Sequence, residues 1–371
     1  MMSVSSNIIS NYKKFWDGSN TNPVVYITYN KKGKSVSETG LVKPWMEGDH
    51  SWIFSRAVIH AHSTGDMSVI KDALDIMEYE LSMACYAGDG YPILHLNTGA
   101  GCVAAFISEF ARFYNDTVWF ELDEPWDFDK ILALKPDFCS TFSDITLEAI
   151  SQAAARFKGH AVLSCLDLGG VSDVLASLRR TSGLLYDMSD STGDVIASLD
   201  VIYHIWKNFL DKMCNILEPA NKGLYSSWAV VLSDEPYYPS QSDFSAMISP
   251  SSFDKIIWPS MSREFSIFDK TLFHLDGSGQ IPHLDTLCSH PSLRIVQWIP
   301  EPMTRESDKA YFPLYENIIA HGRKIAFKGN YTDTAEILAE LFKHFPREAF
   351  FMPVISPSYD EAMRVLEVAW N

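Results

Sequence analysis

Short apolar or β-branched runs recur along most of the chain and alternate with amphipathic stretches. Eight of these runs predict strands, at residues 93–96, 117–121, 161–166, 227–232, 272–276, 295–298, 325–328 and 350–355. Strands that alternate with helices are typical of parallel sheets joined by right-handed crossovers. The pattern therefore predicts an α/β fold.

The clearest predicted helix covers residues 192–217. Leu199, Ile202, Trp206 and Phe209 recur there at spacings of three and four, which places them on one apolar face. We interpret this aromatic face as core packing.

The first 90 residues favour helix instead. A short opening helix is followed by a polar-aromatic loop at 45–50 and a helical stretch over about 53–86. We expect residues 1–90 to form a helical N-terminal extension packed on a domain of residues 91–371, the two acting as one functional unit.

A closed (β/α)8 barrel and an open doubly wound sheet are the two usual outcomes of such alternation. A dinucleotide-binding sheet should show G-x-G-x-x-G directly after its first strand. The nearest candidate, residues 97–102, lacks the third glycine, so the barrel is favoured. Barrel active sites lie at the carboxyl ends of the strands, and polar residues fall at these predicted ends: Asn97, Glu121, Asp167, His274 and Asp276.

The segment from His274 to Gly279 carries the most chemistry. Residues i and i+2 of a strand point to the same face, so we expect His274 and Asp276 to project together. Gly277 and Gly279 then interrupt the strand with backbone that a ligand can approach closely. A paired imidazole and carboxylate can bind a metal, share a proton or hold a polar substrate.

Composition narrows the class of protein. Of 371 residues, 47% are hydrophobic, enough for a large core, and the net charge of −17 disfavours a nucleic-acid or anionic-membrane partner. We see no signal peptide and no apolar run long enough to span a membrane. The six cysteines are dispersed without a C-x-x-C pair, so we expect a reduced cytoplasmic enzyme.

Several common catalytic motifs are missing from the sequence. There is no G-x-S-x-G, H-E-x-x-H or phosphate-loop motif. Acyl transfer by a nucleophile elbow, zincin proteolysis and phosphate-loop hydrolysis therefore have no support.

Six segments, in order over about residues 90 to 370, resemble the uroporphyrinogen decarboxylase superfamily, and most closely its bacterial uroporphyrinogen decarboxylase-like branch. The segments are 117–121, 178–187, 242–250, 273–277, 283–285 and 296–300. The resemblance implies a (β/α)8 TIM barrel with a helical N-terminal extension.

The superfamily implies two chemistries. One is cofactor-free decarboxylation of a tetrapyrrole, whose carboxylates are held by an arginine-rich N-terminal motif. Here that region offers little beyond Lys43 and Arg56, so a substrate with eight carboxylates lacks its counter-charges. The other chemistry is methyl transfer to or from a corrinoid or thiol, usually with zinc.

The zinc ligands of those methyltransferases are only partly matched. The resemblance aligns a His-x-Cys motif with His274 and Asp276, and a later cysteine with the final strand, where Ser356 is the nearest candidate. Thiolate ligands are thus replaced by oxygen. His274 and Asp276 are predicted to hold zinc more weakly, with water completing the shell.

Further site residues follow from strand ends and from the resemblance. Asp243 precedes a Ser-Pro sequence that is typical of a helix start. The resemblance implies that Asp243 faces the mouth of the barrel. The alternative is that it caps a turn. Glu121 is a candidate acid or base. The candidate substrate contacts are Asn97, Asp167, Gly277, His283, Trp298 and Glu301. Both His283 and Trp298 have a purely structural alternative. His283 would lie at the start of a helix, and Trp298 would fill the interior of the barrel.

The leading hypothesis is a methyltransferase that moves a methyl group from a small methylated substrate to a corrinoid protein. The chain has no Asp-x-His-x-x-Gly signature, so the corrinoid is expected on a partner. The alternatives are a cofactor-free decarboxylase of a small or tetrapyrrole-type acid, and a ligand-binding barrel without catalysis.

Overall fold

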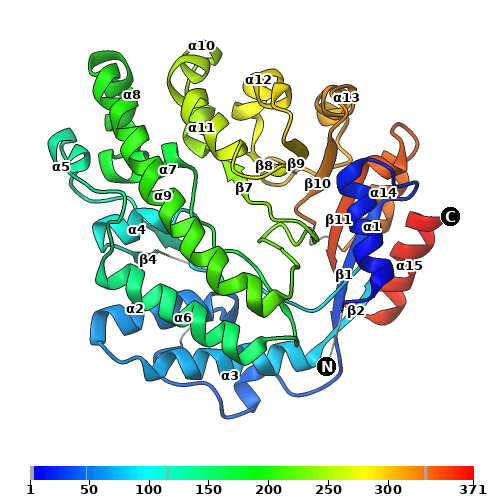
Figure 1. Cartoon of the computed structure of the whole chain (residues 1–371). Coiled ribbons are helices and arrows are strands. Elements are labelled where there is room, and N and C mark those ends of the chain that lie inside the picture. Colours follow the sequence, from blue (N-terminus) through cyan, green and yellow to red (C-terminus); the bar gives the residue numbers. More distant parts are fainter. Residues whose placement is uncertain (1–3, 47, 115–116, 330–331) are drawn as a thin grey trace.

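The computed structural model describes residues 4–46, 48–114, 117–329 and 332–371, and it has an α/β fold. Helices lie around the outside of a central, mostly parallel sheet (Figure 1). No helix in these residues combines the length and the apolar character needed to cross a membrane.

The central sheet has seven strands in the order β2-β1-β11-β10-β9-β8-β7. Only β2 runs antiparallel to its neighbour. The strands are β1 (Val24–Asn30), β2 (Ala84–Gly88), β7 (Pro239–Gln241), β8 (Thr271–Asp276), β9 (Leu293–Ile299), β10 (Lys324–Phe327) and β11 (Phe350–Ile355). Two short strands, β3 (Ile93–Leu94) and β6 (Val162–Leu163), form a separate parallel pair.

The predicted strands of the C-terminal half are confirmed by β8, β9, β10 and β11. The run at 117–121 forms a strand as predicted, β5 (Thr117–Trp119), but this strand pairs antiparallel with β4 (Arg112–Tyr114) outside the central sheet, so the expected parallel pairing is wrong there. The predicted strand at 227–232 is wrong: this run is a loop, bracketed by a single bridge between Tyr225 and Ser233.

The first 90 residues contain the expected helices α1 (Ser6–Asp17), α2 (Ile53–Thr64) and α3 (Ser68–Met83). They also contain β1 and β2, which the sequence pattern did not indicate. Because β1 pairs with β11, the N-terminal part of the chain supplies strands to the central sheet itself.

The long predicted helix is confirmed as α9 (Thr192–Asn221), whose apolar face is buried as expected. It packs on α6 (Thr141–Phe157) and α7 (Val171–Arg179). The remaining α-helices are α4 (Val103–Ser108), α5 (Phe128–Leu132), α8 (Thr181–Asp190), α10 (Pro250–Ser252), α11 (Trp258–Phe265), α12 (Leu284–Ser289), α13 (Phe312–Ala320), α14 (Thr334–Leu341) and α15 (Tyr359–Trp370).

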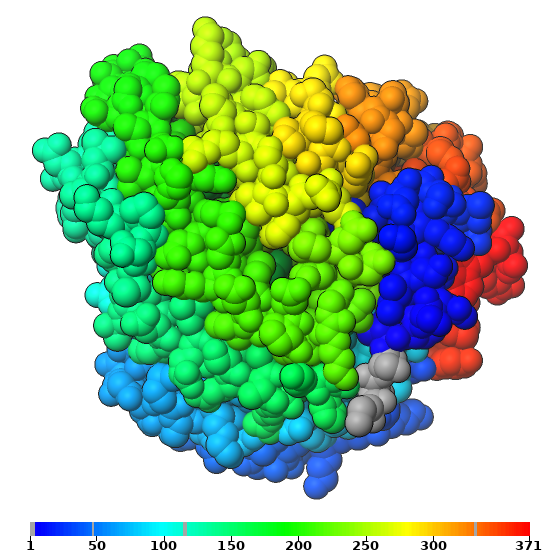
Figure 2. All heavy atoms as spheres, viewed as in Figure 1, coloured from blue at the N-terminus to red at the C-terminus, as the bar shows by residue number. Residues whose placement is uncertain are grey.

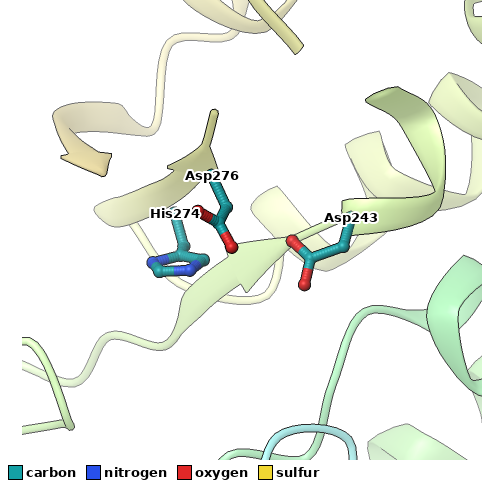
Figure 3. Close-up of side chains that lie close together, drawn as sticks. All are labelled: Asp243, His274 and Asp276. Carbon is teal, nitrogen blue, oxygen red and sulfur yellow. The ribbon is translucent and has the colours of Figure 1, made fainter. Parts of the chain in front are cut away.

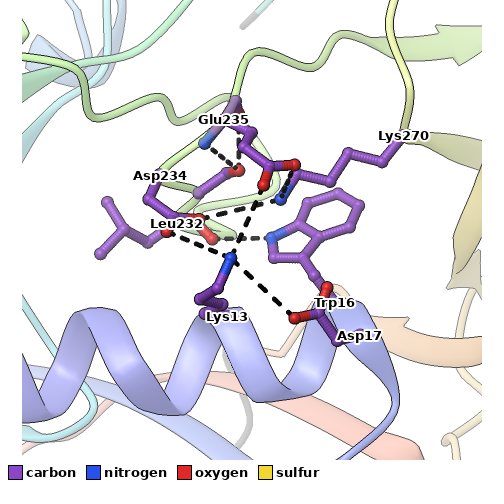
Figure 4. Close-up of polar contacts among 8 residues, drawn as sticks. Lys13, Trp16, Asp17, Leu232, Asp234, Glu235 and Lys270 are labelled. Atoms are coloured by element: carbon purple, nitrogen blue, oxygen red, sulfur yellow. Dashed lines mark hydrogen bonds and ion pairs between the residues drawn. The ribbon is translucent and has the colours of Figure 1, made fainter.

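Helix α1 closes one side of the molecule against the loop 225–237. In the space-filling view, this blue helix lies between the yellow-green loop region and the red C-terminal region (Figure 2). Figure 4 shows Trp16 donating its indole N–H to the Leu232 carbonyl at 2.8 Å. Lys13 forms ion pairs of 3.6 Å with both Asp234 and Glu235 of the same loop.

Candidate functional site

One face of the central sheet lines a cavity of about 1220 Å³. His274 and Asp276 both line it, whereas Leu275 between them is fully buried. The expectation that the imidazole and the carboxylate project together is therefore confirmed. Two other strands of the wall alternate in the same way, through Tyr26 and Thr28 of β1 and Gln297 and Ile299 of β9. Residues 353–355 of β11 and Lys328, just after β10, line the cavity as well.

Asp243 joins His274 and Asp276 in a compact cluster, which we call the Asp–His–Asp cluster. It begins the short 3-10 helix η3 (Asp243–Met247), which follows β7, the neighbour of β8. One ligand atom from each side chain lies within 4.8 Å of the other two. The Asp276 carboxylate sits between the imidazole and the Asp243 carboxylate (Figure 3).

Neighbouring amides orient the cluster. The Nδ1 atom of His274 lies 2.8 Å from Oε1 of Gln297, which is the residue paired with His274 across β8 and β9. Since an amide oxygen only accepts, Nδ1 carries the proton and Nε2 keeps its lone pair for a metal or a proton. Gln280 Nε2 donates to Asp243 Oδ1 at 3.3 Å.

Two buried side chains fix the backbone of η3. The backbone N–H of Phe244 donates to Asp173 Oδ1 at 2.8 Å, which ties η3 to α7. His283 Nε2 donates to the Ser245 carbonyl at 2.9 Å, and its ring stacks on Phe253 at 4.3 Å. His283 is 1% exposed, so the structure places this predicted substrate contact in the core behind the cluster.

Carboxyl groups in and around the cluster have raised pKa values. Burial raises the pKa of Asp243, its neighbour Asp276 raises it further, and His274 opposes both effects. Burial also raises the pKa of Asp167 to about 6 and that of Asp173 to about 8. Bringing a cation or extra protons into this cluster relieves the repulsion between its carboxylates.

Asp167, Gly277 and Glu301 lie around the cluster. Asp167 Oδ1 accepts from Gln241 Nε2 and from the N–H of Gly169, both at 2.9 Å. Gly277 adopts φ +79° directly after Asp276, a conformation that favours glycine. Glu301 lines the cavity, but its Oε1 already accepts from the N–H and the hydroxyl of Ser278.

The structure places Glu121, Asn97 and Trp298 away from the cavity wall. Glu121 follows β5 and pairs with Arg180 at 3.6 Å. Asn97 Oδ1 caps a turn by accepting from the Gly99 N–H at 3.0 Å. Trp298 is fully buried on the opposite face of β9, against Tyr311.

His95, Lys328 and Arg305 also line the cavity, and none of them was among the site residues predicted from the sequence. His95 Nδ1 lies 3.0 Å from the Ser164 hydroxyl, and burial lowers the pKa of His95 to about 4, so its ring is neutral. The alternation rule that selected His274 and Asp276 also identifies Lys328, two residues after the inward-facing Ala326.

The donor set fits a divalent cation without thiolate ligands. Two carboxylates and an imidazole suit zinc, manganese or iron(II). Ser356, aligned by the resemblance with a cysteine ligand, donates its hydroxyl to the Ser358 carbonyl at 2.8 Å and is absent from the cavity lining and from the Asp–His–Asp cluster.

No protein-family model matches the chain, and no curated protein matches it.

Proposed function

We propose that this chain is a (β/α)8-barrel enzyme of the uroporphyrinogen decarboxylase superfamily that moves a methyl group from a small methylated substrate to a corrinoid carried by a partner protein. The barrel part rests on strand order. Strands β1, β3, β6, β7, β8, β9, β10 and β11 follow one another along the chain, and every ladder among them is parallel.

Side chains connect the strands where backbone ladders are absent among the described residues. Between β6 and β7, Gln241 Nε2 donates to Asp167 Oδ1 at 2.9 Å. Between β1 and β3, the Tyr26 hydroxyl donates to the Tyr91 carbonyl at 3.4 Å. These contacts support a ring of eight strands around the cavity.

The observation that carries the functional proposal is the Asp–His–Asp cluster at the wall of the cavity. Its three side chains would hold a divalent cation, with zinc as the first choice, and this ion supplies Lewis-acid activation of the leaving heteroatom. Activation is the demanding requirement, because the leaving group of a methyl ether or amine is basic.

The chain's own residues then have distinct tasks. Gln297 holds the His274 ring with Nε2 free, and Gln280 restrains Asp243. Ile299 and Trp228 add apolar wall to the cavity. During transfer the bond between the methyl carbon and its heteroatom breaks, the heteroatom keeps the bonding electron pair, and the pair for the new bond comes from the reduced corrinoid.

A metal-free decarboxylase of a small acid is the second candidate. The neutral His95 and the cationic Lys328 favour it, since both face the cavity that His274 lines. In that reaction Lys328 would hold a carboxylate, and His274 would return a proton to the carbanion.

Metal binding and product analysis test the proposal together. After chelator treatment, we expect the protein to bind one zinc or manganese ion, measured by calorimetry. H274A and D276N should weaken this binding at least about tenfold, because H274A removes one ligand of three and D276N replaces a charged carboxylate ligand by a neutral amide. D285N is the matched control: it alters the carboxylate of the second His-x-Asp sequence, on α12 and outside the cluster.

The same samples are mixed with cob(I)alamin and a panel of methyl ethers and methylamines, and products are read by mass spectrometry. Metal-dependent methylation of cobalamin that is lost in H274A is the expected result. Release of carbon dioxide by chelator-treated protein would favour the decarboxylase instead. No metal binding and no methyl transfer would overturn the proposal.

A further inference from the structure

We propose that the substrate carries a carboxylate and that Lys328 binds it, on the same cavity wall as the Asp–His–Asp cluster. The identity of the reacting end rests on the proposed function, whereas the carboxylate anchor stands on Lys328 and the cavity alone. The inference therefore names the class of substrate: a small organic acid.

Strand register places Lys328 on the cavity wall. Ala326 of β10 pairs with Gln297 of β9, which pairs with His274 of β8. Lys328 lies two residues beyond Ala326, on the same face, and Asp276 lies two residues beyond His274. The two wall positions are thus separated by two strand spacings, about 10 Å. The side chains of Lys328 and Asp276 line the same cavity.

The charge of Lys328 is not neutralised in the part of the chain that the structure describes. No hydrogen bond or ion pair is formed there by its ammonium group, which is exposed to the cavity. The other cation of the wall, Arg305, is already ion-paired with Asp333. Glu301 is held by Ser278. Lys328 is thus the cation of this wall that is free for a ligand.

Lys328 and the Asp–His–Asp cluster therefore select opposite features of a ligand. A carboxylate is attracted to the ammonium group of Lys328 and repelled by Asp276, so an acid has one favoured orientation. Its other end then lies at His274. The apolar side chain of Ile299, on β9, lines the wall between, which suits a short carbon skeleton. A single free lysine matches one carboxylate better than the many of a tetrapyrrole.

Binding of matched probe pairs tests this without any turnover. The pairs are methoxyacetate with 2-methoxyethanol and 3-methoxypropanoate with 3-methoxypropan-1-ol, measured by ligand-detected NMR on the full chain. We expect at least one acid to bind more tightly than its neutral partner, and K328M to weaken that acid about tenfold while leaving the neutral partner unchanged. K328R should retain most of the preference.

K343M serves as the control, because Lys343 pairs with Glu340 by α14 and does not line the cavity. It should leave every affinity unchanged. Equal binding of acids and neutral partners throughout the panel, or a preference that survives in K328M, overturns the inference. If the preference depends on Lys328 but cobalamin is never methylated, only the proposed function fails. If neutral donors are demethylated as fast as acids, the carboxylate anchor fails and the function stands.

Discussion

At the residue scale, the chemistry of the site depends on which nitrogen of His274 is free. Gln297 is 4% exposed and its side chain contacts Nδ1, so the tautomer is set by a group that is itself fixed in place. A histidine held in this way presents Nε2 to the cavity in one orientation, which lowers the entropy lost when a ligand binds. Asp276 is two residues further along β8 and projects from the same face, so the strand itself places its carboxylate beside the His274 ring.

Asp167 gives a prediction on pH. Its pKa is about 6 in the folded chain against an ordinary 3.8, so the folded protein binds this proton more tightly than the unfolded chain does. The contribution of Asp167 to stability should therefore fall as pH rises from about 4 to about 6, by about 3 kcal/mol at most, and then level off. D167N removes the ionisation, so stability should fall less steeply between pH 4 and pH 6 in the variant than in the wild type, in chemical unfolding of metal-free protein.

The control is D254N, which changes an exposed carboxylate that accepts from the Thr286 hydroxyl at 2.8 Å. Its stability should follow the wild-type pH profile. If D167N and the wild type differ by a constant amount from pH 4 to pH 7, the Asp167 carboxyl does not hold its proton as argued.

Some residues of the site could be predicted from the sequence, and others could not. The i, i+2 rule paired His274 with Asp276 correctly, and applied after β10 it also selects Lys328. Asp243 was found through the resemblance, whereas its distance from His274 depends on the pairing of β7 with β8. His283 followed the same His-x-Asp pattern but stacks on Phe253, because local spacing does not reveal which side of a helix start is buried.

At the element scale, η3 is positioned by α7. Asp173 Oδ1 accepts the Phe244 N–H next to Asp243, and burial raises the pKa of Asp173 to about 8, so this carboxyl is mostly protonated at neutral pH. A side chain that only needs to accept one hydrogen bond can be replaced by an amide. The placement of Asp243 in the cluster thus depends on an element distant in sequence.

Two variants of Asp173 separate this positioning role from charge. D173N keeps an acceptor oxygen, so metal affinity and stability should stay close to wild type. D173A leaves the Phe244 N–H unpaired and should cost about 1–3 kcal/mol of stability and weaken metal binding severalfold. Calorimetry with zinc and thermal unfolding measure the two effects. Equal metal affinity in both variants would show that η3 holds its position without Asp173.

The elements themselves were predictable where each carried a long, regular pattern. The α9 face and strands β8 to β11 follow from periodicity alone. The run at 117–121 has the composition of a strand but pairs with its neighbour β4, and β1 lies in a segment that otherwise favours helix. Strand partners are set by contacts between distant residues, which single-sequence patterns do not contain.

At the scale of the whole molecule, the N-terminal helix supports a wall of the cavity. Trp228, Ala229 and Val230 of the loop 225–237 line the cavity, and Val230 adopts φ +51°, a costly conformation for a β-branched residue. Such a conformation persists only where the surroundings enforce it. The Tyr91 hydroxyl donates to the Val230 carbonyl at 3.1 Å, and Trp16 of α1 holds the Leu232 carbonyl two residues later.

Trp16 and Lys13 allow packing and surface charge to be compared within one contact between α1 and this loop. Trp16 is 3% exposed, packs on Tyr237 and lies under the Lys270 ammonium group, so W16A should cost about 3–5 kcal/mol of stability. Lys13 is half exposed and forms ion pairs only at the surface, so K13A should leave stability close to wild type. Chemical unfolding measures both. Because the loop bears the strained Val230, W16A should also weaken binding of the carboxylate probes, whereas K13A should not. If K13A proves as damaging as W16A, charge rather than packing attaches α1 to the cavity wall.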